Sequence, residues 1–192
     1  MKFSLSREAL LKPLQLVVGV VERRQTLPIL SNVLLSLDQS RLSMTGTDLE
    51  VEIVGVTDIG SGGEDGDVTV SARKLVDICR SLPEEAQIDF SSGDGKATLK
   101  SGRSKFTLAT LPANEFPSVD EGEKTVEFMV PGSALKALIE ATSFAMAQQD
   151  VRYYLNGMLW ELNNNKNLNR EGSVIVINLS GPANKPLIIG ID

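Results

Sequence analysis

The sequence predicts an α+β protein in which helices cover one face of antiparallel β-sheet. Short segments with alternating apolar and polar residues, typical of strands that are buried on one face, follow one another through the first 111 residues. Two longer segments carry apolar residues at intervals of three and four, which is the period of an amphipathic helix. Two helices packed on a sheet of this kind give a layered α+β architecture.

The first thirty residues predict a strand, a helix and an extended segment. Lys2–Ser6 alternates as a strand does, and its final serine can cap a helix that begins at Arg7. Pro13 falls in the second turn of this helix, where we expect it to distort the backbone. Residues 26–30 are expected to be extended, because a residue that precedes proline avoids the helical region. The apolar stripe of the helix consists of Leu10, Leu11, Leu14, Val17 and Val18.

The following residues, up to 111, predict seven more strands and a second helix. The expected helix spans 72–82, ends at Pro83, and has an apolar face of Leu75, Ile78, Cys79 and Leu82. The glycine-rich loop 60–66 lacks the Gly-Lys-Ser/Thr ending of a phosphate-binding loop, so we interpret it as a hairpin tip. The expected strands span 32–37, 41–47, 51–57, 67–71, 86–91, 96–100 and 103–111.

An internal repeat relates the two ends of the chain. Residues 2–37 align with residues 127–162 at a constant offset of 125 and without a gap. The matched pairs include Phe3 with Phe128, Ala9 with Ala134, Leu10 with Leu135, Leu14 with Ile139, Leu30 with Leu155, and Leu34 with Leu159. Although exact identities are few, the ungapped register favours duplication over chance likeness.

The repeat defines two modules. The first spans 1–117, an acidic linker spans 118–124, and the second module spans 125–192. After residue 162 the second module departs from the first: an Asn-rich segment is followed by expected strands at 173–179 and 187–191. The second copy is therefore incomplete, which leaves strand edges and an apolar helix face without their usual cover.

Composition excludes several classes of chemistry. The 192 residues include no histidine and a single cysteine, Cys79, so nucleophilic triads, imidazole zinc sites and disulfides within the chain are excluded. We identify no catalytic constellation, and we expect no metal or cofactor. A cytoplasmic protein without membrane contact is expected, because no apolar segment approaches the roughly 18 residues that span a bilayer. The net charge of −6 argues against a protein that simply wraps nucleic acid.

Two groups of residues could nevertheless contact nucleic acid. Arg73 and Arg80 share one face of the second helix, where they are either ordinary solvated cations or phosphate contacts. The segment from Gln148 to Tyr154 combines two amides and a cation with two aromatic rings, which can hold a nucleic-acid strand. The alternative is that its two tyrosines alternate between core and surface. Arg24 occupies the place of Gln149 in the first copy.

Several motifs resemble the bacterial β sliding clamp, the processivity subunit of the replicative DNA polymerase. They are TLPIL, TGTDLE, SGRSKF, LPANEFP and QDVRYYLNG, and the likeness runs nearly continuously through residues 1–162. The resemblance implies clamp-fold repeats with sheets outside and two helices per domain inside. It also implies a non-catalytic, head-to-tail ring that encloses duplex DNA of any sequence and binds the replicative polymerase and the clamp loader.

The resemblance also implies roles for single residues of this chain. Arg24, Gln149, Tyr153 and Tyr154 match DNA-contact positions, to which the helix spacing adds Arg73 and Arg80. Lys74, Arg103, Lys105 and Leu108 match the first-domain side of the ring interface. Arg152 and Leu155 match part of the pocket that takes the clamp-binding peptides of polymerases and loader.

The segment after residue 162 departs from the family. It reads NNNKNLNREGSVIVINLSG where the family has a Thr-Asp-Gly-His-Arg-Leu segment that supplies more of the peptide pocket. Two such chains are not expected to close the family's ring. The alternatives are a truncated or rearranged clamp, a chain whose tail replaces the missing part, and a small relative with another assembly. The second functional hypothesis is therefore a truncated clamp fragment that binds full-length clamp or clamp loader without encircling DNA.

Overall fold

The computed structural model describes residues 1–21, 27–49, 51–117, 132–147, 150–158, 160–161, 176–177 and 187–189. The chain divides into two compact units, which are considered separately below. The first consists mainly of Met1–Glu121 and also includes Pro186–Gly190, while the second consists mainly of Gly122–Lys185.

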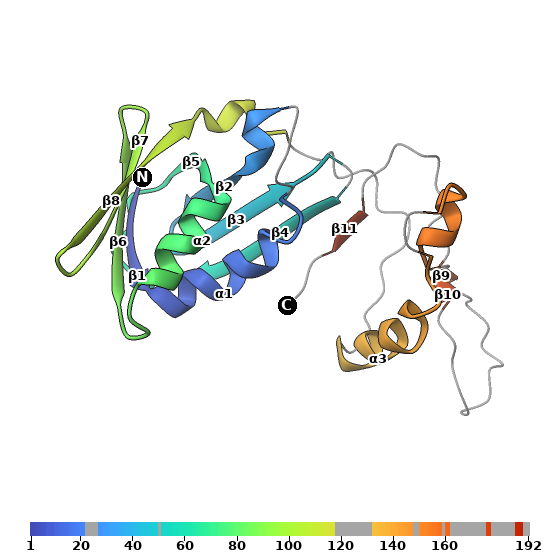
Figure 1. Ribbon diagram of the computed structural model, residues 1–192. Coiled ribbons are helices and arrows are strands. Elements are labelled where there is room, and N and C mark those ends of the chain that lie inside the picture. The colour runs from blue at the N-terminus through green and yellow to red at the C-terminus, as the bar shows by residue number, and fades with distance from the viewer. Residues whose placement is uncertain are drawn as a thin grey trace. The chain divides into compact units, whose positions relative to one another are not determined.

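The first unit has the predicted α+β architecture (Figure 1). Its sheet has the order β1-β6-β7-β8-β5-β2-β3-β4-β11, in which neighbouring strands are antiparallel except for β11 (Leu187–Ile189), which runs parallel to β4. The other strands are β1 (Lys2–Ser6), β2 (Asn32–Asp38), β3 (Arg41–Thr47), β4 (Val51–Asp58), β5 (Gly66–Ser71), β6 (Gln87–Gly93), β7 (Lys96–Ser101) and β8 (Ser104–Leu111). A short 3₁₀ helix, η2 (Ala113–Glu115), follows β8.

Helix α1 (Arg7–Val17) begins where the sequence predicts, because the Ser6 hydroxyl accepts a hydrogen bond from the Ala9 amide at 3.2 Å. Its predicted stripe is buried, apart from the partly buried Val18. The helix continues through Pro13 to Val17, so this proline does not end the helix. Pro13 instead packs against β4: a Cβ added at Gly55 would lie 2.8 Å from the Pro13 Cβ atom.

Helix α2 (Ala72–Ser81) lies beside α1 on the same face of the sheet (Figure 1). On its inner face, α2 contributes the buried side chains of Leu75, Val76 and Cys79. These side chains belong to the same hydrophobic core as the apolar stripe of α1. At the edge of the sheet formed by β1, the ring of Phe3 stacks on the ring of Phe90 in the neighbouring strand β6, with ring centroids 4.7 Å apart. The two helices therefore share one core and one solvent-facing side.

A buried polar network marks the place where β5 meets β8. These strands pair at only two positions, Thr69 with Leu111 and Val70 with Thr110. The buried Thr69 hydroxyl donates to the Leu111 carbonyl at 2.9 Å and accepts from the Leu111 amide at 3.2 Å. It also accepts a bond from the Asn32 side chain at 3.0 Å, so this buried junction is anchored to β2.

Two local predictions are wrong. Residues 60–66 are not a hairpin tip, because the flanking strands β4 and β5 are not neighbours in the sheet. This loop instead reaches β1, where Lys2 and Glu64 exchange backbone hydrogen bonds of 2.9 and 2.8 Å. Residues 28–31 form the 3₁₀ helix η1 (Pro28–Ser31) rather than an extended segment. Proline restricts the residue before it, Leu27, which is extended, whereas Pro28 itself suits a helical first position.

The second unit contains α3 (Gly132–Ser143), the 3₁₀ helix η3 (Tyr153–Asn156), and the two-residue strands β9 (Trp160–Glu161) and β10 (Val176–Ile177). α3 and η3 begin 125 residues after α1 and η1, as the sequence repeat predicts. No side chain of α3 is buried. The expected strands 173–179 and 187–191 are described only at 176–177 and 187–189, and their other residues lie outside the described part of the chain.

We expect Gly55→Ala to destabilise the first unit by about 1–3 kcal/mol, the usual range for overpacking a filled core. The added methyl group would lie 2.8 Å from the Pro13 Cβ atom and 3.1 Å from its carbonyl oxygen, so helix and strand must separate. Chemical denaturation measures the change. Gly93→Ala is the matched control, because nothing lies within 4 Å of its added Cβ. Equal effects of the two substitutions would contradict the role of Gly55.

Candidate functional site

The paired helices are joined at both ends by arginine side chains. Arg7, at the start of α1, donates from Nε to the Cys79 carbonyl near the end of α2 at 2.8 Å. Arg73, near the start of α2, donates from Nη2 to the Val21 carbonyl beyond the end of α1 at 3.4 Å. The two helices therefore run antiparallel, and the Arg7 cation lies at the C-terminal end of α2, where it is favoured by the helix dipole.

The solvent-facing side of the helix pair carries several cations. Lys12 of α1 and both predicted contacts of α2, Arg73 and Arg80, are exposed. Arg73 has a structural hydrogen bond as well, which spacing alone could not indicate. The third expected contact of this module, Arg24, lies outside the described residues. The same two helices also expose Glu8 and Asp77. Exposed cations still outnumber exposed carboxylates on the helix pair, because Lys74 is exposed as well, and this excess suits weak contact with a polyanion.

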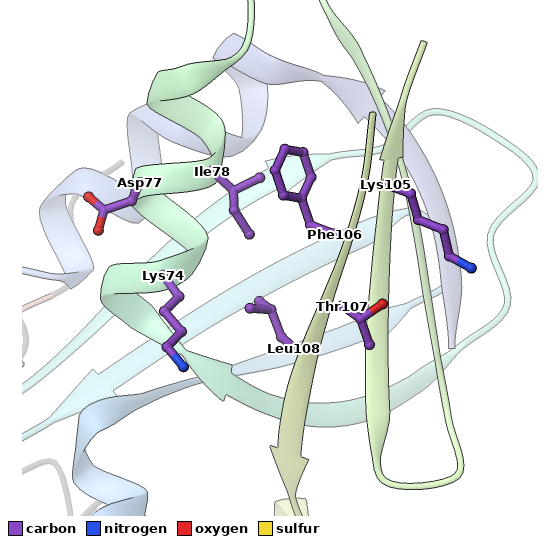
Figure 2. A pocket seen from close by; sticks show the side chains of 7 residues that line it. All are labelled: Lys74, Asp77, Ile78, Lys105, Phe106, Thr107 and Leu108. Carbon is purple, nitrogen blue, oxygen red and sulfur yellow. The ribbon is translucent and has the colours of Figure 1, made fainter. Parts of the chain in front are cut away.

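A shallow depression lies between α2 and β8 (Figure 2). Ile78, Phe106 and Leu108 point into it, whereas Asp77 and Lys105 point away. Its volume is about 470 Å³, and its lining consists of Lys74, Asp77, Ile78, Lys105, Phe106, Thr107 and Leu108. The lining thus combines apolar side chains with two lysines and one aspartate.

The depression includes three of the four predicted interface residues. Arg103 is not part of its lining and lies in the exposed turn between β7 and β8. Leu108 is only 7% exposed, so it contributes more to the core than to a free surface. Ile78 and Phe106 were not predicted as surface residues, although the apolar periodicity of both segments is visible in the sequence. Pattern alone cannot show that a partly buried side chain borders a surface.

In the second unit, the described part of the aromatic segment is a 3₁₀ turn with a charged pair beside it. The Arg152 guanidinium donates to the Asp150 carboxylate from Nε and Nη2, both at 3.0 Å. This pairing lowers the pKa of Asp150 and raises the pKa of Arg152, so both groups are charged near neutral pH. Tyr154 is 67% exposed. Leu155 is half-buried, the side chain of Tyr153 is not described, and Gln149 lies outside the described residues.

The described residues include no cluster of acidic and cysteine side chains that could hold a metal ion. Among them, no helix is both long enough and apolar enough to span a bilayer.

Comparison with known proteins gives two adjoining family matches. Residues 1–120 match the family described as DNA polymerase III beta subunit, N-terminal domain, and residues 129–171 match its central domain. The chain is 61% identical over 163 residues to the beta sliding clamp of Pseudomonas aeruginosa, a match that covers 85% of this chain and 44% of that protein. It is 53% identical over 161 residues to the beta sliding clamp of Escherichia coli, with 84% and 44% covered.

Solved structures give the same result. A Pseudomonas aeruginosa sliding clamp bound to griselimycin superposes with a TM-score of 0.82 at 61% identity, over 85% of this chain and 44% of that one. The Caulobacter crescentus pol III beta structure has a TM-score of 0.78 at 40% identity, with 86% and 45% covered. The chain thus spans less than half the length of the curated relatives it matches.

We expect the Cys79 thiol to be unreactive in the folded protein. Burial raises its pKa to about 11, against the opposing influence of the nearby Arg7 cation, so little thiolate is present at pH 8. Labelling with a chromogenic disulfide reagent at that pH should proceed only as fast as the protein opens. Denatured protein should react at once, with one thiol per chain. Immediate labelling of the folded protein would contradict this packing of α2 against the core.

Proposed function

Because the chain belongs to the family of the DNA polymerase III beta subunit, we propose that it acts as a sliding clamp protein. In this role it holds the replicative polymerase on duplex DNA and has no chemistry of its own. The observation that carries the proposal is the pair of adjacent helices with exposed cations on one side of a complete sheet-and-helix module. Duplex DNA of any sequence presents phosphates to such a surface.

The charge distribution supports sliding rather than fixed binding. A strongly basic protein gains affinity through the counterions that it displaces, and each phosphate contact adds to that affinity. Here the net charge is −6, while Lys12, Arg73 and Arg80 lie exposed on one helix pair. A few weak contacts on an acidic body would guide the duplex without holding it in one register.

The remaining surfaces receive proposed roles from the resemblance. Arg24, Gln149, Tyr153 and Tyr154 would contact DNA together with the helix cations. Lys74, Arg103, Lys105 and Leu108 would form one side of an interface with a second clamp chain. Arg152 and Leu155 would belong to a pocket for peptides of the polymerase and the clamp loader. A cytoplasmic location follows from this role in replication.

A second candidate function is that of an interaction module that binds full-length clamp or clamp loader without encircling DNA. One observation favours this second function. All of the residues that line the depression between α2 and β8 belong to the first unit, whereas no side chain of α3 in the second unit is buried. The chain would then compete with a complete clamp subunit for its partner surface.

Retention on nicked circular DNA, with a bacterial clamp loader and ATP, tests the first function. We expect the chain to remain on the circle through gel filtration and to be lost once the circle is linearised, because a topological link ends at a free DNA end. The full-length Pseudomonas aeruginosa clamp serves as the positive control. No retention on circles, together with binding of the chain to that full-length clamp, would contradict encirclement and establish the second function.

A further inference from the structure

The two ends of the sheet in the first unit are protected in different ways. Apart from the short β11, this sheet ends in β1 on one side and in β4 on the other. Loop 60–66 reaches the outer edge of β1, where Lys2 and Glu64 exchange backbone hydrogen bonds and form an ion pair of 2.7 Å. β1 is only five residues long. A short strand with a lysine and a loop across it is poorly suited to pairing with another chain.

Strand β4 lacks these protections. It has eight residues, VEIVGVTD, which include no lysine and no proline. Gly55 faces α1, so the neighbouring Val54 and Val56 lie on the opposite side of the strand, where they are 37% and 42% exposed. A long edge strand that is apolar on its exposed side is a template on which another chain can pair.

Strand β11 covers part of this edge. It runs parallel to β4, with Leu187 opposite Val51 and Ile189 opposite Ile53. Its surrounding segment, Pro186–Gly190, belongs to the first unit, although the residues before it belong to the second. The chain therefore returns to the first unit and places a strand on the side of β4 that β3 does not occupy.

The covered residues are those that two copies of β4 need for a symmetric pairing. A two-fold antiparallel pair centred on Gly55 would place Glu52 opposite Asp58 of the second copy, and like charges directly opposite are destabilising. Centring on Val54 avoids this, and residues 51–53 of each copy then face residues 55–57 of the other. Because β11 occupies the outer edge of residues 51–53, only Val54 would still face its counterpart while β11 is in place.

We propose that β4 is a self-association edge and that β11 is the intramolecular cover that keeps a second copy of this chain from pairing there. Self-association stops at a dimer, because the two-fold pairing occupies β4 of both copies and β1 is protected by Lys2 and the loop. The cover is separate from the proposed function, since it involves neither DNA nor the depression between α2 and β8.

Cross-linking tests whether β11 covers β4 of its own chain. Neighbouring strands lie about 4.8 Å apart, which is within the Cα distances that a disulfide spans. Glu52→Cys with Ile188→Cys, at positions opposite each other, should therefore form a disulfide within the monomer on mild oxidation, while the buried Cys79 stays reduced. Val56→Cys with Ile188→Cys is the control, because position 56 is four residues further along β4. A covalent dimer, or equal linking in both variants, would contradict the cover.

Removal of the cover should expose the self-association edge. Successive residues of a strand direct their amides to opposite sides, so prolines at both 188 and 189 remove the amide that faces β4. Ile188→Pro with Ile189→Pro should raise the weight-average mass about two-fold over that of the unsubstituted chain at high protein concentration, measured by sedimentation equilibrium. An unchanged mass would overturn the proposal.

Ala183→Pro is the control for this double-proline variant. It adds a proline next to Pro182 in the same tail but outside β11, so it should leave the mass unchanged. Slow labelling of Cys79 in both variants shows that the first unit stays folded. An equal rise in mass in the control would show that the tail acts other than through β11, and would contradict the cover.

Lysine substitutions in the double-proline variant then locate the contact. Val54→Lys places two lysines directly opposite each other in the proposed dimer, so the mass should return to that of the unsubstituted chain. Val56→Lys is the matched control: this similarly exposed valine faces Glu52 of the second copy, and the dimer should persist. Any other combination of masses would overturn pairing at β4. Association through the depression between α2 and β8 would be the same in both lysine variants, because neither alters its lining.

Discussion

The close approach of α1 to the sheet is the constraint on which the other surfaces depend. Two glycines permit it: a Cβ added at Gly46 would lie 2.7 Å from the Val17 side chain, and one added at Gly55 would lie 2.8 Å from Pro13. Because α1 lies this close to β3 and β4, its buried stripe reaches the shared core, and Lys12 remains on the solvent side. A helix lifted away from the sheet would lose core packing and would displace the cations at the same time.

The position of α2 follows from that of α1. Arg7 and Arg73 connect the two helices at opposite ends, and the buried Cys79 and Leu75 fix the face that α2 turns toward the core. This orientation places Ile78 opposite Phe106 of β8 and thereby creates the apolar depression. The exposed helix cations and the apolar depression thus depend on the same packing of α2, and both belong to the first unit.

Much of the first unit could be predicted from the sequence because its strands alternate clearly and its helices have long apolar stripes. The errors occurred in two short connecting segments: the loop 60–66 joins strands that are not neighbours in the sheet, and residues 28–31 form a 3₁₀ helix instead of an extended segment. For the site, helix spacing indicated Arg73 and Arg80, and the family resemblance indicated Lys74. Neither could show that Arg73 also bonds to the Val21 carbonyl, since hydrogen bonds to backbone atoms leave no sequence pattern.

The central claim is that the solvent-facing side of α1 and α2 meets duplex DNA. Acetylation of lysines with and without a short duplex, followed by mass spectrometry, tests it directly. Lys12, on the helix side, should be labelled more slowly when DNA is present, while the exposed Lys96 and Lys100 of β7 should be labelled at unchanged rates. Protection of Lys96 and Lys100 with Lys12 unaffected would place the DNA elsewhere and contradict the account.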